Sequence, residues 1–484
     1  MRVAIIGAGP AGLSAAYELS RHGQTVKIFE QDPRFVGGIS RTVEYKGYRF
    51  DIGGHRFFSK SPEVEAFWAK ILGVDLLVRP RKSRIYYQNK FYDYPLKPLN
   101  AFSNMGLLNT FLCLMDYAKA QAAPHRELKT FEDWVVRHFG RRLFTIFFKT
   151  YTEKVWGIAC NEISADWAAQ RIKGLNLMSA ITHALFPKRE TKQDMVKTLI
   201  EEFYYPRLGP GMLWEKVGQM VVEEGAELLM GQKIISLSHQ NGRIVALEAT
   251  DAHGHITQHC VDHVISSMPI RSLVQALRPA VSSATWEAAS ALHYRDFITV
   301  ALIINTSNLF PDNWIYIHDP SVLVGRIQNF GNWSPAMVPD PSTTCLGMEY
   351  FCFEGDGLWN QSDDALLALA ESELRRMKLI KQEHLIMDGH VVRVPKAYPV
   401  YDEGYQERIA TIRHELAHIA HNLQLVGRNG MHRYNNQDHA MMTGFLAARN
   451  LLGGDYNLWA VNTDAEYLEH TQQERWVPQK VVKA

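Results

Sequence analysis

The chain has 484 residues, more than one compact core usually holds, so we expect two or three domains. Its 52 basic and 51 acidic residues leave a net charge of +1, which argues against a nucleic-acid partner. The five cysteines are odd in number and show no CxxC spacing, which argues against a disulfide framework and favours a reducing cytoplasm.

The first thirty residues have the pattern of a dinucleotide-binding unit: an apolar strand, a glycine turn, an alanine-rich helix and a second strand that ends at Glu30. Gly7 permits the tight turn, Gly9 lets the backbone approach a pyrophosphate, and Gly12 lets the helix pack closely on the strand. The helix N-terminus would supply N–H groups to the phosphates, and Glu30 would accept hydrogen bonds from a ribose. The predicted cofactor contacts of this unit are Gly7, Gly9, Pro10, Ala11, Gly12, Glu30 and Gln31.

The next segment, QDPRFVGGISRTVEYKGYRFDIGGHRFF, contains two further glycine pairs, the second of them just before His55. An NAD domain needs no further close approach of backbone to ligand here, whereas FAD reaches well beyond its adenosine. The segment resembles the FAD-dependent amine oxidase and protoporphyrinogen oxidase superfamily. No second GxGxxG unit follows in a strand context, so we expect no separate NAD(P)H domain. The resemblance implies FAD contacts at Gly37, Gly38, Ser40, Arg41, Gly53 and Gly54.

Near the C-terminus, LQLVGRNGMHRYNNQDHAMMTGFLAARNLL predicts a strand at 423–426, a polar turn and a helix that starts near Asp438. In the superfamily the chain returns to the flavin at this point. The helix N-terminus and Arg428 would then face the rim of the flavin that becomes anionic on reduction. A zinc site was the alternative, but His432 and His439 are seven residues apart without supporting thiolates, so no metal site is predicted.

Several motifs resemble UDP-galactopyranose mutases, in the order of that family: FYDYP, KVWG, DWAAQRIK, AYPVYDEGY and GRNGMHRYNNQDH, together with DIGGHRFFSK, which looks like the histidine loop of the eukaryotic-type members. The resemblance implies an enzyme whose reduced FAD acts through N5 on the anomeric carbon of a sugar and changes its ring size without net oxidation. The substrate would be a small molecule, either a sugar nucleotide or a glycan precursor, with NAD(P)H as a candidate reductant.

The same resemblance assigns roles to individual residues. His55 and Arg428 would be catalytic, His55 by tuning the flavin through hydrogen bonding. Further FAD contacts would be Ile234, Asn436, Gln437 and Asp438. Substrate contacts would be Trp156, Arg171, Tyr401 and Tyr434. The alternatives are a core position for Trp156, a salt bridge on a helix for Arg171 and a loop anchor for Tyr401.

One departure from the mutase pattern lies in FITVALIINTSNLF, where Asn305 stands at the position of an arginine that grips the pyrophosphate. An amide does not replace a charged bidentate group. The nearest substitutes are Arg295 and Arg326. A FAD-dependent oxidoreductase of amine oxidase, protoporphyrinogen oxidase or desaturase type, which transfers hydride from substrate to flavin, is therefore the alternative function. A flavin-binding scaffold without activity is the weakest reading.

We predict an α/β fold, with a discontinuous Rossmann-type FAD-binding domain and a mixed helical and antiparallel-sheet substrate lobe. The FAD-binding domain would comprise residues 1–95, 205–280 and 390–484, the helical part 96–204 and the sheet part 281–389. RPRKSRIYY (79–87) reads as one strand with a solvated face. No apolar run is long enough to span a bilayer, so we predict a cytoplasmic protein; peripheral membrane contact and oligomeric state stay open.

Overall fold

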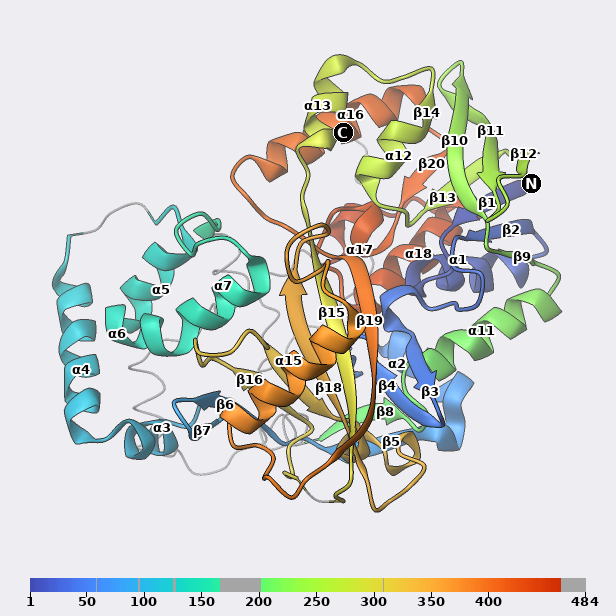
Figure 1. The fold of residues 1–484 in the computed structure, drawn as a ribbon. Helices are drawn as coiled ribbons and strands as arrows, with labels where there is room; N and C mark the ends of the chain where they lie inside the picture. Colours follow the sequence, from blue (N-terminus) through green and yellow to red (C-terminus); the bar gives the residue numbers. More distant parts are fainter. Residues whose placement is uncertain (58, 95, 125–127, 166–201, 308, 463–484) are drawn as a thin grey trace.

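The computed structural model describes residues 1–57, 59–94, 96–124, 128–165, 202–307 and 309–462 (Figure 1). It contains parallel and antiparallel sheets together with a separate group of helices, which confirms the predicted α/β class. The helical group lies at one side of the molecule, and the N-terminal strands lie at the other (Figure 1).

A five-stranded parallel sheet joins segments from both ends of the chain. Its strands, in spatial order, are β20 (Leu423–Leu425), β13 (His263–Ser266), β1 (Arg2–Ile6), β2 (Thr25–Glu30) and β9 (Glu227–Met230). The apolar runs of β1, β2 and β13 are buried, as expected for strands covered on both faces. The predicted N-terminal unit and the predicted C-terminal strand thus lie in one sheet, with β13 between them.

Helices pack beside this sheet at positions where glycines permit close contact. They are α1 (Pro10–Ser20), α2 (Pro62–Leu72), α11 (Gly211–Glu223) and α18 (Gln437–Leu451). A Cβ on Gly444 of α18 would lie 2.1 Å from the carbonyl oxygen of Ala11 in α1, and a Cβ on Gly12 would lie 1.9 Å from that of Gly7. The two helices therefore touch backbone to backbone.

Gly444→Ala is expected to destabilise the protein by about 1–3 kcal/mol, because the added methyl group must push α1 away from α18. The matched control is Gly218→Ala in α11, where the nearest atoms to an added Cβ lie 3.8 Å away. Thermal unfolding of both variants tests this contact. Equal melting temperatures for the two variants would contradict it.

A four-stranded sheet and several helices flank the parallel sheet. The strands, in spatial order, are β12 (Ile256–Cys260), β11 (Arg243–Thr250), β10 (Lys233–Gln240) and β14 (Leu277–Arg278). The helices are α12 (Ile270–Ala276), α13 (Ser283–Ser290), α16 (Tyr405–Ile419) and α17 (Gly427–Gly430). The predicted polar turn after residue 426 thus contains one short helix, α17, before α18 begins.

The central sheet has seven strands, which are antiparallel except where β16 pairs with β6. Their order is β19 (Ile386–Pro399), β15 (Tyr294–Ile304), β18 (Thr344–Cys352), β17 (Arg326–Asn329), β16 (Trp314–Ile317), β6 (Ser83–Tyr87) and β7 (Lys90–Asp93). The helices after β17 and β18 are α14 (Phe330–Trp333) and α15 (Asp363–Arg376). The strands β15, β16, β17 and β18 and the helix α15 all lie within residues 281–389.

Two small sheets complete the strands: β3 (Thr42–Tyr45) pairs with β4 (Tyr48–Asp51), and β5 (Leu76–Pro80) pairs with β8 (Glu202–Pro206). Short 3₁₀ turns occur at Gly38–Ser40, Gly73–Asp75, Pro335–Met337 and Leu458–Ala460. The prediction of one strand over 79–87 is wrong, because β5 ends at Pro80 and β6 begins at Ser83 in a different sheet. A proline offers no N–H to continue a ladder.

The helical lobe consists of α3 (Pro98–Met105), α4 (Leu107–Ala122), α5 (Phe131–Phe139), α6 (Arg141–Phe144), a π-helical turn (Thr145–Lys149) and α7 (Thr150–Trp156). The helices α5 and α6 are separated at Gly140, whose φ is +85°. A Cβ there would lie 2.8 Å from the backbone nitrogen of Tyr117, so α4 approaches closely at this break.

The predicted division into three domains remains a proposal. β6 and β7 precede residue 95 but lie in the seven-stranded sheet, and β19 crosses the predicted boundary at 390. None of the described helices is both long enough and apolar enough to cross a bilayer.

Candidate active site

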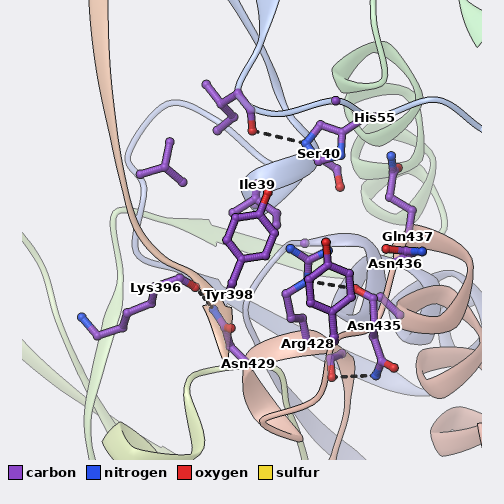
Figure 2. Close-up of a pocket in the computed structure, with 18 of the residues that line it drawn as sticks. Ile39, Ser40, His55, Lys396, Tyr398, Arg428, Asn429, Asn435, Asn436 and Gln437 are labelled. Atoms are coloured by element: carbon purple, nitrogen blue, oxygen red, sulfur yellow. Dashed lines mark hydrogen bonds between the residues drawn. The ribbon is translucent and has the colours of Figure 1, made fainter. Parts of the chain in front are cut away.

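One cavity of about 1440 Å³ connects the parallel sheet, the seven-stranded sheet and the helical lobe. At one end its wall is formed by the glycine turn after β1 and the start of α18. At the other end it is formed by aromatic side chains of the helical lobe. Figure 2 shows part of its wall, including His55, Tyr398 and Arg428.

The glycine turn after β1 leaves the N-terminus of α1 open to the cavity. Gly7 has a φ of +97°, and its N–H donates to the carbonyl oxygen of Phe29 over 2.8 Å. Gly9 lies at the start of α1, and a Cβ on Gly9 would be 3.9 Å from Cα of Gly38. Two backbone segments without side chains therefore border the end of a helix, which is the arrangement that binds a pyrophosphate.

Glu30 lies at the end of β2, where its carboxylate lines the cavity. It accepts hydrogen bonds from the backbone N–H of Ala8 (2.8 Å) and of Asp32 (2.9 Å). Burial raises the pKa of Glu30 despite these two bonds. Arg41 donates to Asp32 over 2.5 Å, and Ile234 lies on the same wall at the start of β10. These groups form the polar end where a ribose and adenine would bind.

The polar C-terminal stretch forms a compact turn that ends at α18. Arg428 donates from Nε to the carbonyl oxygen of Asn435 (2.9 Å) and from Nη1 to that of Ala397 in β19 (3.0 Å). Asn436 caps α18, and Gln437 accepts a hydrogen bond from the indole of Trp214 (3.1 Å). The positive end of α18 and the Arg428 guanidinium therefore meet at the cavity (Figure 2).

His55 lies opposite this turn, and Nε2 is 3.3 Å from the carbonyl oxygen of Ile52. Burial is the main cause that lowers the pKa of His55 to about 4, and the charges of Arg428 and Arg326 contribute to this shift. Arg326 donates from Nε and Nη2 to Glu349, and its Nη1 faces Gly54. His55 is therefore a neutral imidazole near pH 7, able to donate one hydrogen bond and accept another.

Three buried histidines make the protein sensitive to acid. Burial lowers the pKa of His55 and His432 to about 4 and that of His318 to about 3, below the ordinary value of 6.5. Between pH 6.5 and 4 the unfolded chain binds protons that the folded chain does not, so the free energy of unfolding should fall as the pH falls. Asp51, whose pKa burial raises to about 7, acts in the opposite direction.

The contribution of His432 to this pH dependence can be isolated by comparing the wild type with His432→Asn. The free energy of unfolding of both proteins is measured by urea denaturation at pH 7 and pH 5. His432 has a φ of +46°, which asparagine tolerates better than most residues. We expect the wild type to lose more stability than the variant over this interval. An equal loss would show that His432 does not titrate as its burial requires.

Two tyrosine rings flank Arg428 on the side of the cavity predicted to bind the substrate. Tyr398 and Tyr434 stack with their centroids 5.6 Å apart, and the guanidinium lies 5.2 Å and 4.9 Å from these two rings. Trp156 packs against both tyrosines at 6.4 Å and 6.2 Å. Tyr401 does not line the cavity; its hydroxyl accepts a hydrogen bond from the Tyr434 N–H over 2.6 Å, so it positions Tyr434.

Four buried polar atoms on the cavity wall have no hydrogen-bond partner among the described residues: Arg41 Nε, Asn429 Oδ1, Asp438 Oδ1 and His318 Nδ1. Buried polar atoms of proteins are nearly always paired. The first three belong to the part of the cavity that also contains the glycine turn and the α18 N-terminus. A large polar cofactor with donors and acceptors along its length fits this part of the cavity.

The structure brings most of the predicted site residues to this one cavity. The predicted residues on its wall are Gly7, Gly9, Pro10, Ala11, Glu30, Gln31, Gly38, Ser40, Arg41, Gly54, His55, Trp156, Ile234, Arg428, Tyr434, Asn436, Gln437 and Asp438. Gly12, Gly37 and Gly53 lie behind the wall, where they pack against Gly7, Trp214 and His55. Arg171 lies outside the described residues.

Of the two arginines considered as substitutes for Asn305, only Arg326 reaches the cavity. Arg295 is buried and donates to the carbonyl oxygens of Lys154, Val155 and Phe351. It therefore caps the C-terminal end of α7, which contains the first two of these residues. Asn305 is exposed beyond the end of β15 and accepts a hydrogen bond from the N–H of Leu385. The position predicted to face the substrate is thus far from the cavity wall.

Sequence reasoning missed several polar residues on the substrate side. Tyr398 is in the quoted AYPVYDEGY motif, but only its stacking on Tyr434 gives it a role. Tyr151 of α7 and His318 stack with centroids 4.9 Å apart at the cavity, and neither stands in a motif. Only the tertiary structure reveals this contact, because α7 and the end of β16 are far apart in the chain.

The comparisons with known proteins agree with this geometry. Residues 10–452 match the family described as flavin containing amine oxidoreductase. The chain belongs to this family. Protoporphyrinogen oxidase 2 of Arabidopsis thaliana is 46% identical over 466 residues, which cover 85% of this chain and 86% of the plant protein. A probable UDP-galactopyranose mutase of Klebsiella pneumoniae is 26% identical over 183 residues, or 34% of this chain and 43% of that protein.

Among solved structures, reduced UDP-galactopyranose mutase matches with a TM-score of 0.80 at 21% identity, covering 96% of this chain and 97% of the other. This likeness shows a shared fold, and the family match over residues 10–452 confirms the predicted superfamily. The family consists of flavoenzymes, so the chain is an enzyme of the FAD-dependent oxidoreductase type, and FAD is the cofactor that its membership indicates.

Proposed function

We propose that this flavoenzyme acts as a mutase, rearranging the sugar ring of a glycan precursor. The observation that supports this most is the group formed by Tyr398, Tyr434 and Arg428, beside His55 and the N-terminus of α18. Aromatic faces suit the apolar faces of a sugar ring, and a guanidinium suits an anionic leaving group. Reduced FAD, when bound, supplies a nucleophilic N5 and is not consumed in an isomerisation.

The adenosine and pyrophosphate of FAD would be held by Gly7, Gly9, Gly38 and Glu30. The polar rim of its ring would be held by Arg428 and the first turn of α18. His55, neutral near pH 7, would orient the cofactor by a hydrogen bond.

The described walls favour an anionic leaving group that carries an apolar chain over a nucleotide. Of the two arginines considered as substitutes for Asn305, Arg326 lines the cavity, and it is already paired with Glu349. The part of the wall formed by α3 and the π-helical turn is aliphatic and aromatic, with Phe102, Met105 and Phe147. A uracil and a pyrophosphate would find few polar partners there.

The test is an anaerobic reaction of the purified yellow enzyme, with and without prior reduction by dithionite. UDP-linked and polyprenyl-phosphate-linked pyranoses are supplied, and chromatography detects ring isomers. A furanose product that forms only with reduced enzyme is expected. No ring isomer from either substrate class would overturn the proposal.

A second candidate is hydride transfer from an apolar substrate to FAD. The aromatic walls of the helical lobe favour it, as does the similarity to a protein named protoporphyrinogen oxidase. Loss of flavin absorbance when oxidised enzyme meets a porphyrinogen or a polyene, measured by anaerobic stopped flow, would identify this reaction.

A further inference from the structure

The outer face of α4 is apolar, which is the reverse of the usual pattern. α4 packs on α5 and α6 through its inner side, where Cys113 is buried, and it forms the outer edge of the helical lobe (Figure 1). Surface helices normally turn polar residues outward. Here Leu107, Leu108, Phe111 and Met115 are 92%, 72%, 59% and 56% exposed. We call these four residues, with Leu99 of α3 and Leu114, the apolar face.

The charges around the apolar face suit an anionic surface. The charged residues of α4 are Asp116 and Lys119, and the Asp116 carboxylate turns toward Arg142, 4.0 Å away. Lys97 precedes α3; its side chain is exposed and lies 3.8 Å from the carboxylate of Asp93. A lysine thus stands at each end of the apolar face, and the two carboxylates beside this face each have a basic partner, which is compatible with a membrane interface.

The apolar face continues into the cavity of the active site. Tyr94 and Leu96 are exposed to solvent and also line the cavity. On α3, Ala101, Phe102 and Met105 line it from inside, directly before the turn into α4. The apolar end of the cavity and the apolar face therefore share α3 as their common border.

We propose that the apolar face docks on the surface of a phospholipid bilayer, with α3 and α4 resting at the headgroup level and the apolar end of the cavity turned toward the lipid. A second copy of the chain on the same face would cover Tyr94 and Leu96 and close this end of the cavity. A bilayer leaves it open to apolar molecules dissolved in the membrane.

The test is flotation of the holoenzyme with vesicles of phosphatidylcholine, alone or mixed with phosphatidylglycerol. We expect binding to both and tighter binding to the anionic mixture. The double variant Leu107→Glu/Leu108→Glu should lower the partition coefficient about ten-fold or more, because two exposed leucines no longer leave water. Both glutamates stand in the first turn of α4, where acidic residues favour the helix, so flavin absorbance should be unchanged.

The matched control is Ile256→Glu on β12, which is 61% exposed and lies on the opposite side of the molecule in Figure 1. It should bind vesicles like the wild type. Wild-type protein that does not float with either vesicle, or an equal loss in the control, overturns the proposal. So does an oligomer, detected by light scattering, that Leu107→Glu/Leu108→Glu dissociates while the wild type does not bind vesicles.

The lysines provide a separate readout. Lys97→Gln/Lys119→Gln should reduce the preference for vesicles that contain phosphatidylglycerol, and binding to phosphatidylcholine alone should change little. An unchanged preference would show that the apolar face docks without these charges and would overturn their part in the proposal.

Docking also defines a substrate class, a step that rests on the proposed function. The substrate would be an amphiphile, with its polar ring near Tyr398 and its apolar chain against the helical lobe. Leu107→Glu/Leu108→Glu should slow turnover of a polyprenyl-linked pyranose in vesicles and leave turnover of a short-chain, water-soluble analogue unchanged. If flotation succeeds and neither compound reacts, the proposed function fails and the docking surface stands.

Discussion

Gly9→Ala is expected to weaken FAD binding about ten-fold to a hundred-fold without unfolding the protein. The backbone of Gly9 has a φ of −81°, which alanine adopts easily, and its Cβ would meet nothing closer than Cα of Gly38 at 3.9 Å. The added methyl group would instead occupy the space between two backbones where the pyrophosphate of FAD is predicted to lie. Overpacking of this kind costs about 1–3 kcal/mol.

The measurement is the dissociation constant of FAD, from fluorescence quenching of the deflavinated protein, together with the melting temperature of the apoprotein. Gly218→Ala serves as the control, since it adds the same methyl group to a helix without facing the cavity. Unchanged FAD affinity in Gly9→Ala would mean that the pyrophosphate lies elsewhere.

Arg428→Met is expected to lower turnover about a hundred-fold and to shift the reduction potential of the bound flavin to more negative values. Among the described residues Arg428 has no carboxylate partner, and its side chain donates hydrogen bonds to backbone carbonyl oxygens. Its charge is therefore free to stabilise an anionic group in the cavity. Removal of one preorganised donor of this kind typically lowers turnover by about a hundred-fold or more.

Arg428→Lys separates the charge from the geometry. Lysine keeps the positive charge but cannot bond to Asn435 and Ala397 together in the planar arrangement of a guanidinium. We expect Arg428→Lys to keep a potential near that of the wild type and to lose turnover. If Arg428→Met leaves the potential unchanged, Arg428 acts only by holding the turn.

The end of the cavity formed by the glycine turn and the start of α18 could be predicted from sequence because local rules govern these segments. The spacing of Gly7, Gly9 and Gly12 between two apolar strands requires one turn geometry, and the structure has it. The C-terminal strand and helix were also found within a few residues, since apolar periodicity and an asparagine cap mark them.

The substrate end could not be predicted in the same way, because its contacts join distant strands. Asn305 was aligned by strand pattern alone, and a shift along β15 moves a residue from the cavity to the surface. Arg326 faces the cavity only because β17 pairs with β18, where Glu349 accepts a hydrogen bond from its guanidinium. No local pattern encodes such pairing.

The contact of Gly444 with Ala11 has a consequence for biosynthesis. The α1 N-terminus, made first, gains its partner only after α18, near the end of the chain, has left the ribosome. A nascent chain that ends before β20 lacks one edge of the parallel sheet and also lacks Arg428, Asn436 and Gln437 of the cavity wall. Flavin loading is therefore expected only after β20 and α18 have been made, and polypeptides truncated upstream of β20 should accumulate colourless.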